Sequence, residues 1–359
     1  MGGRVGLKGT DGAQIKEKAI RLGATKRSPP RAVEALREIA LMKDDIDLVT
    51  YPHEMGENEA IECGFSPRVI GSVESGSTTA EDTKRAAREM ADLEVDMILF
   101  AGGDGTARDI CEAIDQELPV LGIPTGVKIH SSVFAVNPRK AGRLAVDYLR
   151  GEASLKTAEV MDIDEEAFRE NRLSAELHGY LKIPFEKRLV QPTKSASSPG
   201  IDEESNKEAI AEYVVAEMDD SIFLLGPGTT VKAVADRLGT EKTLLGVDVV
   251  NQDEILARDV NEDEILELVK GKDVKIVVSP IGGQGFIFGR GNQQISPEVI
   301  KQVGRDNIIV IATKSKLSSR KPGEPLYVDT GDKDVDEMLS GYMRVITGYQ
   351  EEAVVKVSR

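Results

Sequence analysis

The stretch VDMILFAGGDGTARDI, residues 95 to 110, constrains the fold more than any other part of this chain. An apolar run, MILFA, ends at a group of glycines, and a helical pattern begins directly after them. An apolar run without polar alternation is typical of a strand buried on both faces, as in a parallel sheet covered by helices. Asp104 stands among the glycines, at the end of the expected strand where α/β folds bind their ligands.

The first half of the chain continues this alternation of helices and strands. Patterns of apolar residues predict helices over residues 30–42 and 79–92, and strands over residues 46–52, 68–73 and 119–124. Asn137 and Pro138 are typical of a helix start, and Gly151 is a natural end for that helix. We therefore expect a doubly wound parallel-sheet domain of the α/β class over residues 1–150.

The second half predicts a mixed α/β domain that is richer in β structure, over residues 151–359. Residues 154–190 read as strands and a hairpin, and residues 191–206 as a surface loop or mobile flap. Two later segments read as a strand, a glycine turn or long glycine loop, and a helix: SIFLLGPGTTVKAVADRLG and KIVVSPIGGQGFIFGRGNQQISPEVIKQVG. The last segment could pack back on the first domain.

Four glycine-rich stretches share one pattern: MGGRVGLKGTDG, AGGDGT, LGPGTT and IGGQGFIFGRGNQQ. Glycines at a strand-to-helix turn allow unusual dihedral angles and bring peptide N–H groups close to an anion, which the positive end of the helix also attracts. Several such loops indicate a polyphosphate ligand. A plain structural connection is the alternative for LGPGTT and for the first loop, before which we expect a strand to be missing.

The candidate phosphate- and nucleotide-binding residues come from these loops and from the segment IPTGVK. They are Gly3, Arg4, Lys8, Gly102, Gly103, Gly105, Thr106, Thr125, Gly126, Lys128, Gly228, Thr229, Thr230, Gly283, Gln284, Gly285, Arg290, Asn292 and Gln293. The GPGTT stretch is also similar to the phosphate-binding turn of sugar-phosphate isomerases.

Asp104 is the candidate catalytic residue. Phosphoryl transfer to an alcohol needs a cradle for the donor phosphates, usually Mg²⁺, and a carboxylate that orients or deprotonates the attacking hydroxyl. Lys128 could neutralise developing negative charge. Alternatively, Asp104 only caps a helix that begins near Thr106. His130 could contact the ligand or act as a base, or be a structural residue, as we interpret His53 and His178.

The composition narrows the partners and the location. A formal net charge of -16 opposes binding to nucleic acid or to an anionic membrane. Two cysteines without a pairing or metal-binding spacing favour a reducing cytosol. We find no apolar run of the roughly 20 residues that a membrane span requires. We expect a cytoplasmic protein that acts on a small molecule.

The motif GGDGT, followed by a short helix and PVLGIP, resembles the ATP-NAD kinase superfamily, which is related to diacylglycerol and sphingosine kinases and to phosphofructokinases. The stretches GGRVGLKGTDG, IPTGVKIHSSVFA, LGPGTT, GVDVV and GGQGFIFGRGNQQISPEVI resemble its archaeal and bacterial branch of predicted polyphosphate- or ATP-dependent NAD kinases, including AcoX-like proteins. The resemblance implies that Asp104 is the catalytic aspartate and that its glycine neighbours meet phosphates. It also implies a β-rich C-terminal domain, an interdomain cleft, and a homo-oligomer, commonly a dimer or tetramer.

The implied activity is phosphorylation of the adenosine ribose 2′-hydroxyl of NAD or NADH by ATP or inorganic polyphosphate, with Mg²⁺ or Mn²⁺. Two features of the family pattern are missing. The Asn-Glu pair that grips NAD has no clear counterpart, since NQDE at residues 251–254 is a poor substitute, and no Asn-Pro segment precedes the first glycines. Two alternatives stay open: a kinase of another small alcohol or diol, and a nucleotide-binding sensor without catalysis.

Overall fold

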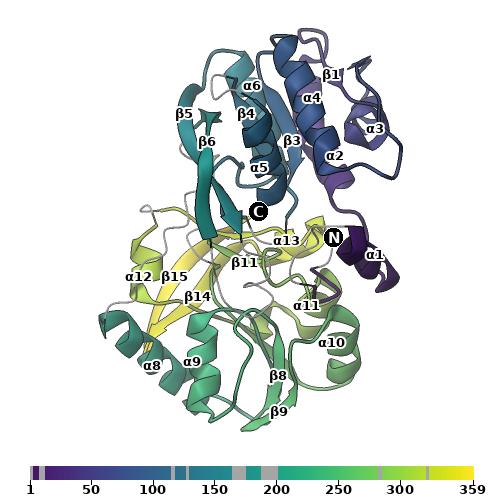
Figure 1. Cartoon of the computed structure of the whole chain (residues 1–359). Helices are drawn as coiled ribbons and strands as arrows, with labels where there is room; N and C mark the ends of the chain where they lie inside the picture. Colours follow the sequence, from purple (N-terminus) through teal and green to yellow (C-terminus); the bar gives the residue numbers. More distant parts are fainter. Residues whose placement is uncertain are drawn as a thin grey trace. The chain divides into compact units, whose positions relative to one another are not determined.

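The computed structural model describes residues 3–7, 13–114, 118–126, 129–163, 175–186, 201–281, 285–320 and 323–359. They form two compact units (Figure 1). The N-terminal unit holds the described residues between 25 and 186, and the C-terminal unit holds those of 3–24 and 201–359. Within the described ranges, every helix is too short or too polar to cross a membrane.

These units divide the chain differently from the boundary expected at residue 150. The hairpin that follows this boundary belongs to the N-terminal unit, because its Val160 and Leu181 side chains are buried in that unit's core. Residues 3–24 belong to the C-terminal unit, where the Arg4 carbonyl accepts a hydrogen bond from the Glu262 peptide N–H at 3.0 Å. Tertiary packing therefore sets both differences.

The N-terminal unit alternates helices with short strands. Its helices are α2 (Ser28–Ile39), α3 (Glu57–Glu62), α4 (Ala80–Asp92), α5 (Asp104–Ala113) and α6 (Pro138–Leu149), with 3-10 turns η1 (Ala40–Met42) and η2 (His53–Met55). Its strands are β1 (Val49–Thr50), β2 (Arg68–Val69), β3 (Ile98–Gly102), β4 (Val120–Pro124), β5 (Ser154–Ile163) and β6 (Ala175–Phe185).

The strand pairing confirms the α/β fold class. Strands β1 and β2 pair in parallel, as do β3 and β4, while β5 and β6 form an antiparallel hairpin. The described strands form separate two-stranded ladders rather than one continuous sheet. Every residue of β4 is buried, whereas Leu99 and Ala101 of β3 are partly exposed, so MILFA is not buried on both faces throughout.

Two predicted helix starts are confirmed. The Thr79 hydroxyl accepts from the Asp82 peptide N–H, and the Asp82 carboxylate accepts from the Thr79 peptide N–H, which is a capping box at the start of α4. The Asn137 side chain accepts from the Lys140 peptide N–H and caps α6. Both starts could be predicted because a cap depends only on neighbouring residues.

A close approach beside β4 positions the segment that follows it. A methyl group added to Gly122 would lie 2.3 Å from Cδ1 of Phe134, so only glycine lets this ring pack on the strand. The peptide of Gly122 also donates to the Val133 carbonyl and accepts from the Ala135 peptide N–H, at 2.9 and 3.0 Å. Residues 133–135 are thereby fixed beside β4.

The C-terminal unit is built on a nine-stranded mixed sheet in the order β11-β13-β15-β14-β12-β10-β7-β8-β9. The strands are β7 (Ile222–Leu225), β8 (Asp248–Asn251), β9 (Glu254–Ala257), β10 (Val274–Val278), β11 (Phe286–Phe288), β12 (Ile308–Ile311), β13 (Leu326–Val328), β14 (Gly341–Gly348) and β15 (Glu351–Ser358). The helices are α1 (Ala13–Arg21), α8 (Ile201–Ala216), α9 (Thr229–Arg237), α10 (Glu262–Val269), α11 (Pro297–Val303), α12 (Lys314–Ser318) and α13 (Lys333–Leu339), with the 3-10 turn η4 (Arg305–Asn307).

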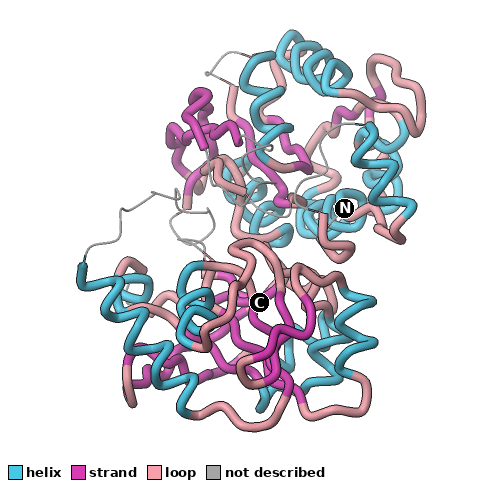
Figure 2. The backbone as a smooth tube through the Cα atoms, turned by 60° about the horizontal axis from the view of Figure 1, so that its bottom comes forward, coloured by secondary structure: helices cyan, strands magenta, loops and turns pink. Residues whose placement is uncertain are grey.

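Helices cover both faces of this sheet (Figure 2). Successive side chains of a strand point to opposite faces. In β7, Ile222 and Leu224 therefore pack into the core with α10, α11 and α13, while Phe223 and Leu225 pack into the core with α8 and α9. The continuous apolar run of β7 follows from burial on both faces.

Two expected loops contain regular structure. Residues 201–206, expected in a loop or flap, begin α8, whose buried Ile210 and Val214 pack under the sheet. Residues 191–200 lie outside the described part of the chain. The long glycine loop contains β11, which pairs in parallel with β13. The last segment, expected to pack back on the first domain, forms β14 and β15 of the C-terminal sheet.

Candidate active site

The turn from β3 to α5 carries the GGDGT motif. Helix α5 begins at Asp104, with Gly103 as its N-cap residue and no side-chain cap. A methyl group added to Gly102 would lie 2.4 Å from Oγ1 of Thr106, so this glycine is required by a close approach within the turn. Gly103 has a φ of -128°, which any residue adopts, so the expected unusual dihedral is not the reason for the glycine there.

The Asp104 carboxylate is held by the segment that follows β4. Oδ1 accepts from the Ser131 peptide N–H at 2.9 Å, and Oδ2 accepts from the His130 peptide N–H at 2.9 Å. The side chain is 8% exposed. These partners lie outside α5, and the helix starts two residues before Thr106, so the capping alternative is wrong. The carboxylate is instead fixed in one orientation by two peptide dipoles.

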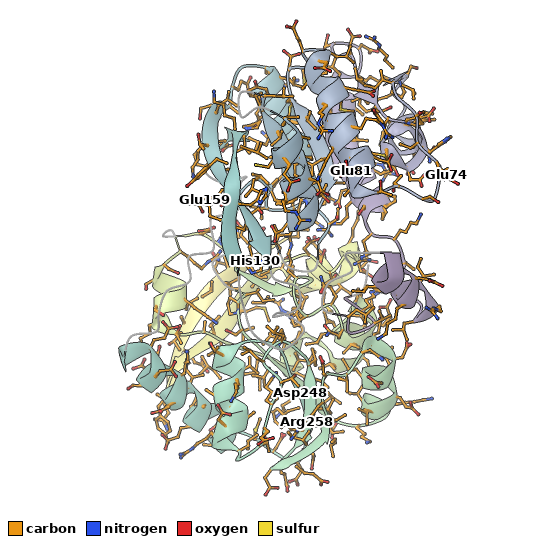
Figure 3. All side chains as sticks on the ribbon, in the orientation of Figure 1. Glu74, Glu81, His130, Glu159, Asp248 and Arg258 are labelled. Atoms are coloured by element: carbon orange, nitrogen blue, oxygen red, sulfur yellow. The ribbon has the colours of Figure 1, made fainter. Side chains whose placement is uncertain are left out.

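The His130 ring lies against the same carboxylate. Its Nδ1 is 3.4 Å from Oδ2 of Asp104, and the residue is only 5% exposed (Figure 3). The other ring nitrogen, Nε2, is buried and has no hydrogen-bond partner among the described residues. Asp104 and His130 thus form an acid–base pair at the start of α5.

The segment after β4 adjoins the GGDGT turn. The Thr125 peptide N–H donates to the Gly102 carbonyl at 2.9 Å, and a methyl group added to Gly103 would lie 3.5 Å from Cα of Gly126. The Ser28 hydroxyl reaches Oγ1 of Thr125 at 3.2 Å. The structure therefore brings the predicted residues of GGDGT and of IPTG together. Lys128 lies outside the described residues.

The GPGTT turn lies in the C-terminal unit, between β7 and α9. Gly228, the uncapped N-cap residue of α9, has a φ of 115°, which favours glycine. Its peptide N–H donates to the Leu244 carbonyl at 2.9 Å and is therefore already used. Thr229 is exposed, whereas Thr230 is buried, and its hydroxyl accepts from Nζ of Lys316 at 3.1 Å.

Lys316 links two strand ends of this unit. Its Nζ also lies 3.1 Å from the hydroxyl of Ser279, which follows β10, the neighbour of β7 in the sheet. Sequence analysis missed Ser279, Lys316 and also Ser131. A peptide N–H such as that of Ser131 leaves no trace in a side-chain pattern, and Lys316 is 86 positions from Thr230.

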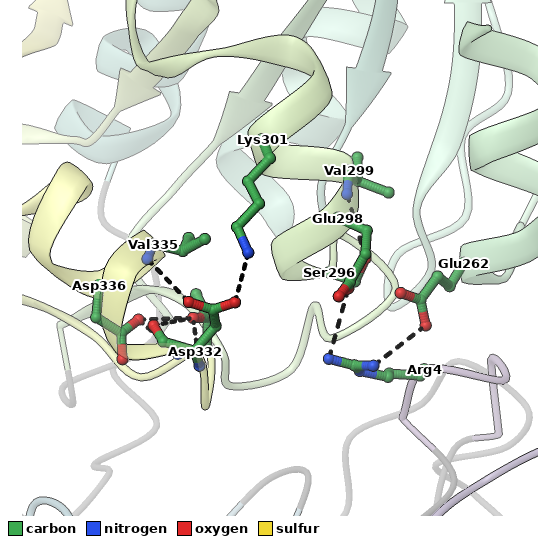
Figure 4. Close-up of polar contacts among 10 residues, drawn as sticks. Arg4, Glu262, Ser296, Glu298, Val299, Lys301, Asp332, Val335 and Asp336 are labelled. Carbon is green, nitrogen blue, oxygen red and sulfur yellow. Dashed lines mark hydrogen bonds and ion pairs between the residues drawn. The ribbon is translucent and has the colours of Figure 1, made fainter.

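The first glycine segment packs on the C-terminal unit. A methyl group added to Gly3 would lie 2.8 Å from Oε1 of Gln293. The Arg4 guanidinium lies 3.8 Å from a carboxylate oxygen of Glu262 and 3.7 Å from one of Glu298 (Figure 4). Two carboxylates thus compensate the charge predicted to meet phosphate. Lys8 lies outside the described residues.

The third glycine loop uses its polar residues to hold its own strand. Nδ2 of Asn292 donates to the Ile287 carbonyl at 2.8 Å. The buried Arg290 guanidinium lies 4.6 Å from the Phe286 ring centroid, and its Nη2 lies 3.7 Å from Oδ2 of Asp329. These contacts stabilise β11 within the unit.

One residue of the same loop is a glycine for conformational and steric reasons. Gly285 has a φ of 71°, and its Cα faces the Arg320 guanidinium. Burial lowers the pKa of Arg320, although the neighbouring Glu324 opposes this effect. Gly283 and Gln284 lie outside the described residues.

Family comparison places both units in one family. Residues 25–153 match the ATP-NAD kinase N-terminal domain, and residues 218–357 match the ATP-NAD kinase C-terminal domain. The chain belongs to the ATP-NAD kinase superfamily. The matched regions contain Asp104 and His130 in the first domain and the GPGTT turn in the second. Comparisons with curated proteins and with solved structures gave no match.

Membership of the ATP-NAD kinase superfamily supports phosphoryl transfer of the NAD kinase type, with NAD as substrate. The AcoX-like branch stays a prediction. In the described ranges, no group of three or more His, Cys, Asp or Glu side chains is arranged to hold a metal ion. Phosphotransferases usually bind Mg²⁺ through one or two carboxylates and the phosphates of the substrate, and the Asp104 carboxylate at the start of α5 is of the right chemistry for such a ligand.

Proposed function

We propose that the protein is an NAD kinase, which transfers the terminal phosphoryl group of ATP or inorganic polyphosphate to the 2′-hydroxyl of the adenosine ribose of NAD or NADH. One observation carries this proposal besides family membership. The Asp104 carboxylate stands at the uncapped start of α5 and is held by the peptides of His130 and Ser131 rather than by its own helix. Such a carboxylate is oriented for a ligand, not for capping.

The start of α5 is also suited to the donor phosphates. A helix N-terminus without a side-chain cap has free peptide N–H donors and a positive dipole end, both of which favour an anion. We propose that Gly103, Gly105 and Thr106 contact the phosphates, together with the adjoining Thr125 and Gly126. Mg²⁺ or Mn²⁺ bound to the phosphates would neutralise their charge.

The remaining predicted ligands divide by what their polar groups already do. In the GPGTT turn, Thr229 and Thr230 remain candidates for a second phosphate, beside Lys316. Arg4, Arg290 and Asn292 have partners within the C-terminal unit, which makes them weaker candidates. Lys8, Lys128, Gly283 and Gln284 stay predictions.

The direct test is formation of NADP. The full-length protein is incubated with NAD or NADH, Mg²⁺ or Mn²⁺, and either ATP or polyphosphate, and NADP or NADPH is measured with a specific dehydrogenase. We expect product with at least one donor, and the donor that gives it identifies the phosphoryl source. No product under any combination would remove NAD as the acceptor.

A second acceptor class is favoured by the contacts of residues 251–254. Nδ2 of Asn251 donates to the carbonyls of Asp220 and Ser221, at 3.0 and 3.2 Å, and Nε2 of Gln252 donates to Asp220 at 2.8 Å. The segment that stands in for the NAD-gripping Asn-Glu pair is thus used inside its own unit. The second candidate is a kinase of another small alcohol or diol.

Donor consumption against a panel of hydroxyl compounds separates the two acceptors. Release of ADP, or shortening of polyphosphate, only with a compound other than NAD would support the second candidate. A nucleotide-binding sensor would bind a dinucleotide without consuming donor, and Asp104→Asn would leave its response unchanged. We also propose that the protein works in the cytoplasm and as a homo-oligomer, on the cysteine content and the family resemblance.

A further inference from the structure

We infer that His130 is a second catalytic residue, whose Nε2 accepts the proton of the attacking hydroxyl while Asp104 holds the other side of the ring. This inference rests on the proposed function, because it concerns the phosphoryl transfer assigned to the same site. The observations that carry it are the 3.4 Å contact between Nδ1 of His130 and Oδ2 of Asp104, and the buried Nε2 without a partner.

The hydrogen-bond inventory fixes the tautomer of the ring. An ionised carboxylate only accepts hydrogen bonds, and each oxygen of Asp104 already accepts one from a peptide N–H. Nδ1 therefore carries the proton where it faces Oδ2. A neutral imidazole has one donor and one acceptor nitrogen, so Nε2 presents a lone pair. Within the Asp104–His130 pair, Nε2 is the ring atom left to accept a proton.

Burial makes this lone pair unusual. A buried polar atom without a partner costs about 1–3 kcal/mol, and such atoms are rare in folded proteins. His130 is 5% exposed, and its Nε2 has no partner in the described part of the chain. A hydroxyl of the acceptor substrate is the donor that this nitrogen lacks. The carboxylate on the opposite side of the ring then stabilises the imidazolium that forms.

The other two histidines have different surroundings. The side chain of His178 is 26% exposed, and its Nε2 lies 3.5 Å from Oε1 of Glu112. The side chain of His53 is 51% exposed and lies 4.0 Å from Glu57. Neither is fixed beside Asp104. They serve as matched controls, because all three histidines of the chain lie in the N-terminal unit.

The proposed step balances as follows. The O–H bond of the acceptor breaks, and its proton forms an N–H bond at Nε2 of His130. The freed oxygen forms a bond to the terminal phosphorus of ATP or polyphosphate. The bond from that phosphorus to the bridging oxygen breaks, and its electron pair leaves with ADP or the shortened polyphosphate. His130 later returns its proton to solvent or to the departing group.

Nitrogen-15 NMR of the full-length protein tests the tautomer without any substrate. His53→Gln and His178→Gln remove the other two imidazole signals and leave that of His130. We expect a protonated Nδ1 and an unprotonated Nε2 at neutral pH, and a loss of this preference in Asp104→Asn. A ring protonated at Nε2 alone would overturn the inference, whether or not NAD is the acceptor.

Kinetics then test the proton transfer. General acid–base catalysis typically contributes about 10²–10⁴-fold, so we expect His130→Gln to lower kcat by that factor with little change in donor affinity. His178→Gln should stay within about twofold of the wild type. Imidazole added to His130→Ala should restore part of the rate, which a purely structural role would not allow. A kcat of His130→Gln within threefold of the wild type would contradict the inference.

Failure of the inference is distinguishable from failure of the proposed function. If NAD is not phosphorylated, the wild type makes no NADP, but the NMR result stands. If another acceptor is found, the same kinetic comparison is made with that acceptor. If the wild type makes NADP and His130→Gln makes it equally fast, only the role of His130 is lost.

Discussion

The two turns GGDGT and GPGTT have the same order of strand, glycines and helix, yet glycine is needed in them for different reasons. At β3–α5, a methyl group on Gly102 would collide with Thr106, while no unusual dihedral is involved. At β7–α9, Gly228 has a φ of 115°, and an added methyl group would meet no atom within 4 Å. The first turn needs space, and the second needs conformational freedom.

The polar groups of the two turns differ as well. The first presents a carboxylate paired with an imidazole, which suits proton transfer and orientation of a hydroxyl. The second presents a buried hydroxyl, Thr230, beside the cation Lys316, which suits an anion but offers no base. The comparison shows that a shared glycine pattern predicts where a ligand binds, whereas the chemistry depends on what the turn contacts.

The largest effect on stability is expected from Gly102→Ala. Overpacking typically costs about 1–3 kcal/mol, and with backbone and side-chain atoms this close we expect about 3 kcal/mol of unfolding free energy to be lost. Gly103→Ala is the control, because its methyl group would lie 3.5 Å from Gly126 and should cost less than about 1 kcal/mol. Chemical denaturation measures both.

A double variant sharpens this result. Thr106→Gly removes the atoms that the added methyl group would meet, so Gly102→Ala/Thr106→Gly should be more stable than the sum of the single changes predicts. Strict additivity would show that the steric account of this turn is wrong.

A smaller loss, about 2 kcal/mol, is expected from Gly228→Ala. Backbone conformations reserved for glycine cost other residues about 1–3 kcal/mol. Because no atom lies within 4 Å of the added methyl group, truncating a neighbour should bring no relief. Gly228→Ala/Leu244→Ala should therefore be additive in unfolding free energy. A coupling as large as that at Gly102 would erase the contrast between the two turns.

The smallest effect is expected at α4, whose start carries its own anion. The Thr79 hydroxyl, together with its peptide N–H, donates to the Asp82 carboxylate and holds the pKa of Asp82 below its ordinary value. A lowered pKa means stability that is present above the ordinary value of about 3.9 and is lost as the pH falls through the folded value. Asp82→Asn should lower Tm slightly at pH 7.

The same comparison at acid pH checks the sign. The difference in Tm between Asp82→Asn and the wild type should shrink as the pH falls below about 4. Asp44→Asn, at an exposed position, should show no such dependence. A difference that grows on acidification would contradict the assigned direction. Unlike α4, the uncapped helices α5 and α9 should gain stability from added phosphate donor.

Features set by neighbouring residues could be predicted from the sequence. The caps Thr79 and Asn137 and the strand–turn–helix order depend on local patterns, and the structure confirms them. The order of the nine strands and the inclusion of residues 3–24 in the C-terminal unit depend on long-range packing. No local pattern shows that Arg4 lies beside Glu262 and Glu298.

The candidate site divides in the same way. Asp104 could be selected from the sequence because a carboxylate among three glycines is a local signal. Its partners His130 and Ser131 lie 26 and 27 positions away and are brought there by packing of the segment after β4. The sequence could therefore indicate the carboxylate but not that a ring nitrogen would share its work.

The central claim is that phosphoryl transfer depends on Asp104. The most direct measurement is kcat for NADP formation by Asp104→Asn, compared with Asp109→Asn, which makes the same change in the same helix. We expect Asp104→Asn to lower kcat by at least about 10³-fold, in the range typical of a lost catalytic acid–base group, while Asp109→Asn stays within about fivefold. A kcat for Asp104→Asn within tenfold of the wild type, in a folded protein, would contradict the account.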